Sequence, residues 1–495
     1  MDFLSTRNKE VKVKSSRAIF EGLSREGGLY VPGSFPKISQ DDMEEMLDMS
    51  YEEKAAFILG KYLTDFSAEE LEAFTDEAYA DFEEGNPAPL VMVDSSTAML
   101  ELWHGPTCAF KDMALRLLPH LVLASAKAQK IKEKPLLMVA TSGDTGKAAL
   151  DAFAAVPETK VIVFYPTDGI SNVQKLMMTT QEGDNVAAAG VKGNFDDCQK
   201  KVKELFRDPA FNLEVKKAGY FLTSANSINL GRLLPQIVYY FSAYLDLAAG
   251  EEICIGDKVN FAVPTGNFGN ILAGYYACKM GLPANKFICA SNSNNVLTDF
   301  FKTGVYDANR IFYKTKSPAM DILVSSNLER LIFEISGRDD NLTAERMDSL
   351  AKAGKYSITP KELAALKKIF YAAYVDDAQT LDALNNFFSG NDYLCDPHTA
   401  TAICAYNEYL VETEDDETPV IILCTAHPYK FAGDVLAAIE PDAEADNDIE
   451  CMNILKELSA MERPEEILSA LRSEPKHTDV IERSEIGDYT LKFIK

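Results

Sequence analysis

The sequence is poor in basic residues, with 49 Lys and Arg against 76 Asp and Glu, and its formal net charge is −27. Nucleic-acid binding depends on basic patches that neutralise phosphates, so this balance argues against a nucleic-acid partner. The same excess of acid disfavours binding to an anionic membrane surface. The longest uncharged stretch, 259–278, is interrupted by Pro264 and by several Gly and Asn residues, which a lipid-exposed helix would avoid. We therefore expect neither a nucleic-acid nor a membrane partner.

Cysteine and histidine are also scarce, with nine Cys and five His in 495 residues. The cysteines are scattered, odd in number and without a C-x-x-C pair, so neither a disulfide framework nor a zinc site fits them, and we expect no metal. The first residues, MDFLSTRNKEVKVK, lack the apolar stretch that is typical of a signal peptide. Together these features predict a cytoplasmic protein with reduced thiols.

Short apolar runs alternate with helix-length segments from residue 135 onward. Near-continuous apolar runs separated by helices are typical of buried strands in mostly parallel sheets, so the sequence predicts an α/β fold. The runs occupy residues 135–140, 160–166, 185–191, 220–223, 259–264, 286–291 and 420–425.

The pattern divides the chain into three predicted domains. Residues 1–90 are acidic and mostly helical in pattern, and 91–250 and 251–495 are predicted to be two α/β domains. The alternation of strands and helices stops between about 305 and 395. A helix is predicted to begin there at Thr359, which is followed by Pro, and this stretch is predicted to be a helical insertion.

Two strand-to-helix junctions are rich in glycine, hydroxyl and amide residues. The first follows the run at 135–140 and reads T-S-G-D-T-G (141–146), and the second follows 259–264 and reads T-G-N-F-G-N (265–270). Such a turn presents free backbone N–H groups at the positive end of a helix dipole, so each junction is a candidate anion site. A tight turn that merely caps the next helix is the simpler alternative. Neither junction matches a P-loop or a dinucleotide fingerprint.

A lysine follows a turn that contains the chain's single Trp. The segment E-L-W-H-G-P-T-C-A-F-K-D (101–112) places Lys111 at the start of an apolar helical run. A lysine among apolar neighbours can have a lowered pKa and act as a nucleophile. A surface lysine with a packed stem is the ordinary alternative, and this segment alone does not decide between them.

The order of motifs along the chain resembles the threonine synthase family, within the fold-type II pyridoxal-phosphate enzymes. The chain contains H-G-P-T-x-A-F-K-D, T-S-G-D-T-G, G-N-F-G-N and C-T-A-H-P in this order. A single motif would be weak evidence, whereas the ordered set extends over nearly the whole chain. The resemblance is to the longer branch of the family, and it implies a tryptophan synthase β-like fold of two mostly parallel α/β domains. Further matching segments are G-G-L-Y-V-P (27–32), N-S-I-N-L-G-R (226–232), S-P-A-M-D-I (317–322) and D-P-H-T-A (396–400).

The resemblance also implies a cofactor, pyridoxal 5′-phosphate, and a role for individual residues. Lys111 would bind the cofactor covalently and move protons on the substrate, and Thr425 would contact the pyridine nitrogen. Asp144 lies where related enzymes often have Asn beside the 3′ oxygen of the cofactor. The cofactor phosphate is assigned to Gly266, Asn267, Phe268, Gly269 and Asn270, and the substrate to Ser142, Thr145, Asn226, Ser227 and Arg232.

The reaction implied by the resemblance converts O-phospho-L-homoserine and water to L-threonine and phosphate. Another fold-type II enzyme, such as a serine or threonine dehydratase, and a non-catalytic binder of a phosphorylated metabolite are the alternatives. The presence of Lys111 and Thr425 argues against a pure binder. His104, His398 and His427 are expected to be structural. Because the chain carries −27 and its expected ligands are anions, we expect an electropositive cavity within an electronegative surface. The sequence does not indicate an oligomeric state.

Overall fold

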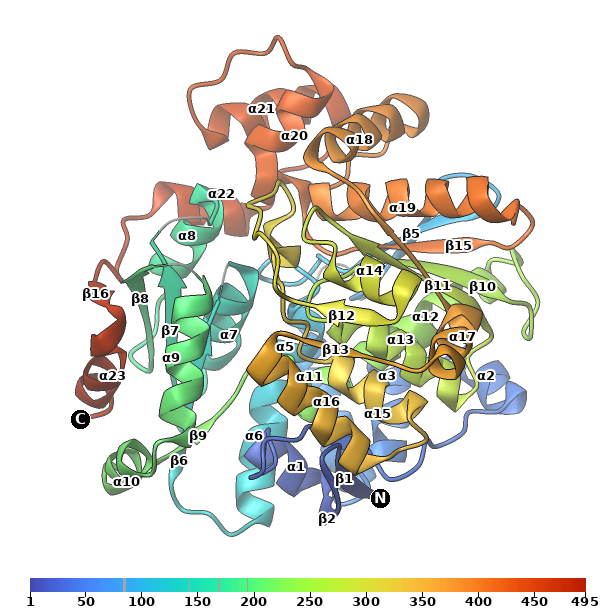
Figure 1. Cartoon of the computed structure of the whole chain (residues 1–495). Coiled ribbons are helices and arrows are strands. Elements are labelled where there is room, and N and C mark those ends of the chain that lie inside the picture. Colours follow the sequence, from blue (N-terminus) through green and yellow to red (C-terminus); the bar gives the residue numbers. More distant parts are fainter. Residues whose placement is uncertain (83–85, 142, 168–169, 194) are drawn as a thin grey trace.

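The computed structural model describes residues 1–82, 86–141, 143–167, 170–193 and 195–495, and its two main β-sheets lie in two neighbouring lobes (Figure 1). Strands of the larger sheet pair in parallel except for its last pair, which is antiparallel. Its strand order is β14 (Phe370–Tyr374), β11 (Ala284–Ser291), β10 (Val259–Pro264), β15 (Val420–Cys424), β5 (Thr97–Glu101) and β4 (Leu90–Met92).

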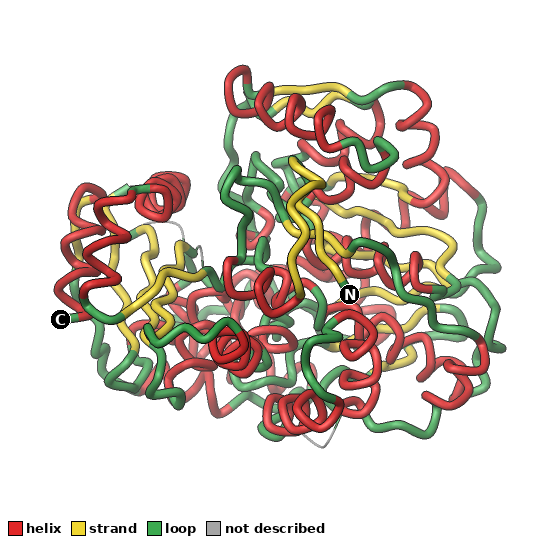
Figure 2. Tube along the Cα trace, turned by 90° about the horizontal axis from the view of Figure 1, so that it is seen from below, coloured by secondary structure: helices red, strands yellow, loops and turns green. Residues whose placement is uncertain are grey.

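The smaller sheet is parallel throughout. Figure 2 shows its lobe beside the larger one, with the C-terminus in the smaller lobe and the N-terminus on the larger. All seven predicted strands are present in the two sheets, which confirms the α/β class. The order in the smaller sheet is β16 (Val480–Glu482), β8 (Val186–Lys192), β7 (Lys160–Pro166), β6 (Lys134–Ala140) and β9 (Tyr220–Thr223).

Alternate residues of the central strand β10 enter two different hydrophobic cores. Phe261 and Val263 pack in the core that includes α13 (Gly269–Met280), whereas Ala262 packs in the core that includes α19 (Pro397–Thr413). Since side chains of a strand alternate between the two faces of a sheet, these helices cover opposite faces, as Figure 1 also shows. The run is apolar throughout because both of its faces are buried.

The sheets cross the predicted boundary at residues 250 and 251 in both directions. Strand β5 lies within the range 91–250 but pairs with β15 of the larger sheet. Strand β16 lies within 251–495 but pairs with β8 of the smaller sheet. Both strands are short, and their place is decided by pairing with residues far away in the chain.

The first ninety residues contain a sheet as well as the predicted helices. Antiparallel pairs join β1 (Asp2–Ser5) to β2 (Asn8–Lys14) and to β3 (Tyr30–Pro32). Strand β2 is mostly exposed and polar, so it has no apolar run by which it could be recognised. The helices of this region are α1 (Ser15–Glu21), α2 (Gln40–Met46), α3 (Tyr51–Tyr62) and α4 (Ala68–Tyr79).

The stretch predicted to be a helical insertion, 305–395, contains four α-helices, and it also contains strands. Strand β14 directly follows the helix that begins after Thr359, and it forms an edge of the larger sheet. A short antiparallel pair is formed by β12 (Val305–Asp307) and β13 (Lys355–Ser357). The helices are α15 (Leu328–Ile335), α16 (Asp340–Ala353), α17 (Pro360–Ile369) and α18 (Asp377–Asn391).

The remaining helices surround the two sheets. Within the described ranges, no helix has both the length and the apolar character needed to cross a membrane. In chain order they are α5 (Asp112–Leu115), α6 (Leu118–Ala128), α7 (Asp144–Ala154), α8 (Asn172–Thr179), α9 (Phe195–Arg207), α10 (Pro209–Lys217), α11 (Leu230–Leu233), α12 (Gln236–Ala249), α14 (Val296–Thr303), α20 (Ala432–Ile439), α21 (Asp448–Ser459), α22 (Glu465–Arg472) and α23 (Ile486–Ile494). The 3-10 helices among the described residues are η2 (Pro318–Met320), η3 (Pro428–Phe431) and η4 (Arg483–Glu485).

Candidate active site

A cavity of about 1250 Å³, its open mouth included, lies where strands of both sheets end. Its wall is formed by the segments that follow the carboxyl ends of β6, β9, β10 and β15. Ligands of open parallel sheets bind at this end of the strands, where free N–H groups of the following helices converge. Both glycine-rich junctions and Lys111 lie on this wall.

Lys111 immediately precedes α5, and its side chain is buried in the cavity wall. The segment that carries it is fastened to the end of β15, because Phe110 N–H donates to the Thr425 carbonyl at 2.9 Å and Ala109 pairs with Ala426. Two residues that are far apart in the sequence, Lys111 and Thr425, therefore line the same part of the cavity.

The Lys111 amine faces Asp144, the first residue of α7, with Nζ 3.4 Å from Oδ2. Burial lowers the pKa of Lys111; Asp144 opposes this shift, and the charges of Arg232 and Lys430 add to it. Burial alone would raise the pKa of Asp144, but Lys430 and Lys111 outweigh burial and hold that pKa well below its usual value. Asp144 is thus an anion beside an amine that releases its proton more readily than an exposed lysine does.

The second junction forms a tight loop before α13. Phe268 has a left-handed backbone conformation with φ +62°, and it turns the chain into the helix. The Gly266 carbonyl accepts a hydrogen bond from Ser325 Oγ at 2.8 Å, and the Asn267 carbonyl accepts from Asn327 Nδ2 at 3.1 Å. These bonds orient the loop while the first N–H groups of α13 have no partner within the helix. The geometry is that of an anion site at a helix N-terminus.

Asn270 lies in the first turn of α13 and is held by two tyrosines. Its Oδ1 accepts hydrogen bonds from Tyr239 at 2.6 Å and from Tyr240 at 2.9 Å. Its Nδ2 is buried and has no hydrogen-bond partner in the described part of the chain. Because Asn270 lines the cavity, an unpaired donor is available to a ligand there.

Arg232, on α11, is the second buried cation of the cavity wall, with 5% of its surface exposed. Its Nη1 donates to the Ala225 carbonyl at 2.9 Å. Its Nε has no partner, and no carboxylate lies within 4.0 Å of the guanidinium among the residues that the structure describes. Burial lowers the pKa of Arg232 to about 10. A buried guanidinium without a counter-ion is a site that an anionic ligand completes.

Asn226 and Ser227 line the cavity near Arg232 and do not cap its helix. The cap of α11 is Asn229, whose side chain accepts from Gly231 N–H at 2.9 Å. Ser227 Oγ accepts from Asn327 at 3.0 Å, which connects this segment to the second junction. Asn229, and not Asn226 or Ser227, therefore caps this helix.

The first junction contributes Thr141, Gly143, Asp144 and Thr145 to the cavity wall. Thr141 Oγ1 accepts from the N–H groups of Gly143 and Gly146 at 3.0 Å each, which closes the turn before α7. Ser142, predicted to contact the substrate, lies outside the described residues.

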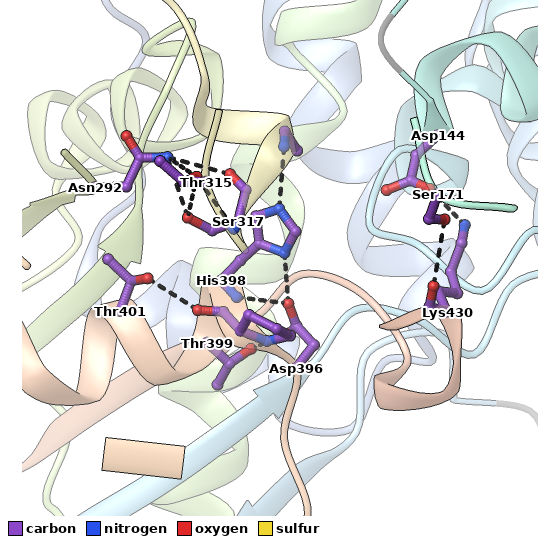
Figure 3. A network of polar contacts seen from close by, with 12 residues as sticks. Asp144, Ser171, Asn292, Thr315, Ser317, Asp396, His398, Thr399, Thr401 and Lys430 are labelled. Atoms are coloured by element: carbon purple, nitrogen blue, oxygen red, sulfur yellow. Dashed lines mark hydrogen bonds and ion pairs between the residues drawn. The ribbon is translucent and has the colours of Figure 1, made fainter. Parts of the chain in front are cut away.

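His398 also lines the cavity, and a carboxylate fixes its orientation (Figure 3). Its Nδ1 lies 2.6 Å from Asp396 Oδ1, and its Nε2 accepts from the Ala319 N–H at 3.1 Å. With Nε2 accepting, the ring proton is on Nδ1 and faces Asp396. His398 thus positions the loop around η2, and its predicted structural role stays a prediction.

Three further polar residues of the site have no signal in the motifs. Gln174 on α8 and Lys203 on α9 line the cavity, and Lys430 on η3 lies behind Asp144. Lys430 directly follows the segment C-T-A-H-P-Y, so its place at a strand end is the one feature that could have suggested it. Gln174 and Lys203 lie on helical segments without an unusual pattern.

The charges of the cavity wall are mostly positive. Lys111, Lys203 and Arg232 line it together with one acid, Asp144, among the described residues. The expected electropositive cavity is thus present in a chain whose net charge is −27. A local field of this kind attracts an anion although the whole protein repels it.

Comparisons with known proteins find relatives of one enzyme family along nearly the whole chain. Family models match in three segments: "Threonine synthase N terminus" at residues 2–79, "Pyridoxal-phosphate dependent enzyme" at 87–425 and "Threonine synthase, C-terminal" at 399–486. Threonine synthase of Pseudomonas aeruginosa is 37% identical over 87% of this chain and 89% of its own length. Human threonine synthase-like 1 is 39% identical over 88% of this chain, which spans 61% of the length of that relative.

A solved structure has the same architecture over its full length. The crystal structure of pyridoxal-phosphate-bound threonine synthase from Brucella melitensis superimposes with a TM-score of 0.86 at 34% identity, covering 100% of both chains. The fold-type II architecture predicted for this chain is thereby confirmed.

Proposed function

This chain belongs to the threonine synthase family of pyridoxal-phosphate-dependent enzymes, and on this premise we propose that it converts O-phospho-L-homoserine and water to L-threonine and phosphate. The observation that carries the proposal is Arg232, a buried guanidinium with no carboxylate partner in the described ranges, in the same cavity as Lys111. A dehydratase acting on serine or threonine has no phosphate on its substrate and no use for this second anion site.

The residues present fit pyridoxal phosphate. The loop 266–270 offers backbone N–H groups and the unpaired Nδ2 of Asn270 to the cofactor phosphate. Lys111 is the amine that would hold the cofactor covalently, and Thr425 is the hydroxyl available to its pyridine nitrogen. Asp144 would lie beside the 3′ oxygen. When bound, the cofactor supplies an electron sink that makes protons on the substrate carbons removable.

The remaining roles follow from charge and position. Arg232 would bind the phosphate of the substrate through the planar fork of its guanidinium, assisted by Asn226 and Ser227. Thr145, half-buried at the start of α7, would donate to the substrate carboxylate. Lys111, whose pKa burial lowers, would then accept the protons at Cα and Cβ and return one at Cγ and, after water has added at Cβ, one at Cα.

We also propose that the protein is cytoplasmic, with a small phosphorylated amino acid as its substrate and without a nucleic-acid partner. None of its nine cysteines, all of which lie in the described ranges, forms a disulfide. This supports a reducing compartment. The acidic net charge supports the absence of a nucleic-acid partner.

The test is turnover by the purified, cofactor-loaded protein. We expect a yellow protein whose cofactor borohydride fixes on Lys111, and which releases equal amounts of L-threonine and phosphate from O-phospho-L-homoserine. Lys111→Ala should abolish turnover, whereas Lys192→Met, which removes a surface lysine paired with Glu482 at 2.6 Å, should not change it. A colourless protein that takes up no pyridoxal phosphate would refute the enzyme assignment. Dehydration of serine or threonine with inert phosphohomoserine would assign the protein to the other class.

A further inference from the structure

We propose that Lys430 is a positioning residue of this site: by pairing with Asp144 it turns the carboxylate into the neutral, fixed partner that the cofactor and Lys111 require. This inference rests on the proposed function, because it assumes that pyridoxal phosphate binds next to Asp144. It adds a residue to the site that no motif of the sequence indicates.

The geometry divides the two oxygens of Asp144 between different partners. Oδ1 lies 2.6 Å from Lys430 Nζ and accepts a hydrogen bond from Gln174 Nε2 at 2.9 Å. Oδ2 is the oxygen that faces Lys111, with Nζ at 3.4 Å. Lys430 and Gln174 thus hold one oxygen in place, and the other oxygen is directed to the reactive amine.

The Lys430 ammonium is buried completely and is itself oriented. Its side chain has 0% exposure, and the side chain of Asp144 has 1%. A second bond runs from Nζ to the Thr107 carbonyl at 2.7 Å. The Lys430 carbonyl accepts from Ser171 Oγ at 3.5 Å (Figure 3). Keeping a buried lysine charged costs free energy of desolvation, unless an anion pairs with it. Lys430 and Asp144 therefore depend on each other.

The pair also connects the two lobes. Lys430 lies on η3, which follows β15 of the larger sheet, and Asp144 begins α7, which follows β6 of the smaller sheet. Gln174 adds a third element, α8, whose N-cap Ser171 makes the contact with Lys430. The orientation of Asp144 is consequently set by packing between lobes and not by its own turn alone.

Chemistry explains why a carboxylate at this position needs such a partner. The 3′ oxygen of pyridoxal phosphate carries negative charge, and a neutral amide could donate a hydrogen bond to it, whereas a lone carboxylate repels it. An ion pair has no net charge, so Lys430 compensates the charge of Asp144 and removes its repulsion of the 3′ oxygen. Among the described residues, the ionisable groups that face Asp144 are Lys111, which precedes α5, and Lys430 from η3, and Arg232 on α11 contributes to the field at Lys111.

The experiment is a spectroscopic pH titration of the cofactor bound to the full-length protein, which reports the protonation of the nitrogen at Lys111. In Lys430→Met the carboxylate loses its counter-charge, so the midpoint should rise by about 1 pH unit or more, a tenfold change in the protonation ratio. In Asp144→Asn the ammonium loses its counter-charge, and the midpoint should fall by a similar amount. Lys192→Met, which breaks a 2.6 Å surface pair, should leave the midpoint unchanged.

The double variant Lys430→Met/Asp144→Asn shows whether Lys430 acts on the cofactor site through Asp144 or only stabilises the fold. It contains no unpaired buried charge, so its midpoint should return to within about 0.5 pH unit of the wild-type value if the pair acts as a neutral unit. The rate at which the cofactor-free protein takes up pyridoxal phosphate across pH gives a second readout. It should shift in the same direction as the midpoint in each variant.

Two outcomes would overturn the inference. One is a Lys430→Met protein with the wild-type midpoint and uptake profile. The other is a double variant that is displaced as far as either single variant. If Lys430→Met does not fold, Asp144→Asn and the double variant replace it, and a midpoint that falls in Asp144→Asn and is restored in the double variant would support the inference. A wild-type protein that binds no pyridoxal phosphate would refute the proposed function itself and is recognised before any variant is made.

Discussion

Replacing Arg232 with methionine is expected to stabilise the folded protein and to impair its proposed reaction. The guanidinium is buried, makes one hydrogen bond to the Ala225 carbonyl at 2.9 Å and leaves Nε unpaired. Methionine has a similar length and is apolar, so it fills the space without a charge. The substitution therefore separates what the charge costs in folding from what it contributes to binding.

The size of the stability effect follows from the pKa of Arg232, which burial lowers from 12.5 to about 10. Each pH unit corresponds to about 1.4 kcal/mol, so the charged form is disfavoured in the folded state by roughly 3 kcal/mol. Because the folded pKa is the lower one, this destabilisation is fully present below pH 10 and is relieved as the pH rises through 10 to 12.5. Removal of the hydrogen bond to Ala225 offsets about 1.5 kcal/mol, which leaves a net gain of about 1 to 2 kcal/mol.

The effect on activity has the opposite sign. A charge-assisted hydrogen bond to a charged ligand contributes about 1.5 to 3 kcal/mol, so kcat/KM for phosphohomoserine should fall roughly 10- to 150-fold for each such bond that the substitution removes. Binding of L-threonine, which has no phosphate, should change little and serves as the matched control ligand.

Thermal unfolding with and without inorganic phosphate measures both effects on one sample. Without phosphate, Arg232→Met should melt about 1 to 4 °C above the wild type. Phosphate should raise the wild-type midpoint and leave that of the variant nearly unchanged, since only a protein with the anion site gains from the ligand. A variant that is less stable than the wild type, or that is stabilised equally by phosphate, would show that Arg232 is a structural residue.

Three other expectations concern the loop, the insertion and the segment of Lys111. In Gly266→Ala the new Cβ would lie 3.1 Å from the Ala319 carbonyl oxygen. Overpacking of about 1 to 3 kcal/mol should weaken pyridoxal phosphate binding roughly 5- to 150-fold in a spectroscopic titration. An unchanged affinity would contradict the tight fit of this loop. Arg346→Met breaks a buried ion pair with Glu362 that has two hydrogen bonds, of 2.8 and 2.7 Å. The free energy of unfolding should fall by about 3 kcal/mol or more, seen as a lower melting temperature, with kcat unaffected at low temperature. An unaltered melting temperature would rule out a stabilising role for this ion pair. Burial raises the pKa of Asp112 from 3.8 to about 6, so its contribution to stability is present below pH 3.8 and is lost as the pH rises through 6. The stability of Asp112→Asn relative to the wild type should therefore rise by about 3 kcal/mol between about pH 4 and 7, and a constant difference would refute this.

The sequence predicts a strand most clearly where the strand is buried on both faces of its sheet. The run at 259–264 is apolar throughout because its residues enter two cores, one on either side of the sheet. Strands β5, β14 and β16 carry weaker signals, since they are short or lie at a sheet edge. Their membership of a sheet depends on partners that are distant in the chain, and a local pattern cannot indicate those partners.

The candidate site likewise contains residues that sequence motifs indicate and residues that only the structure reveals. Lys111, the loop at 266–270 and Arg232 lie in motifs whose order suggested their roles, and the structure brings them to one cavity. Gln174 and Lys430 carry no such signal. Each contacts Asp144 only because helices and strands from both lobes pack together there.

The sequence by itself determined the α/β class, the strand-to-helix junctions and the chemical types at the site, because these depend on local periodicity and on backbone preferences of Gly, Pro and polar residues. Only the tertiary structure decided which strands share a sheet, that Asn229 and not Asn226 caps α11, and that Asp144 pairs with Lys430 through one oxygen and faces Lys111 with the other. The scarcity of cations illustrates the physical reason. A net charge of −27 describes the average surface, whereas burial and close contact among a few residues set the field inside the cavity.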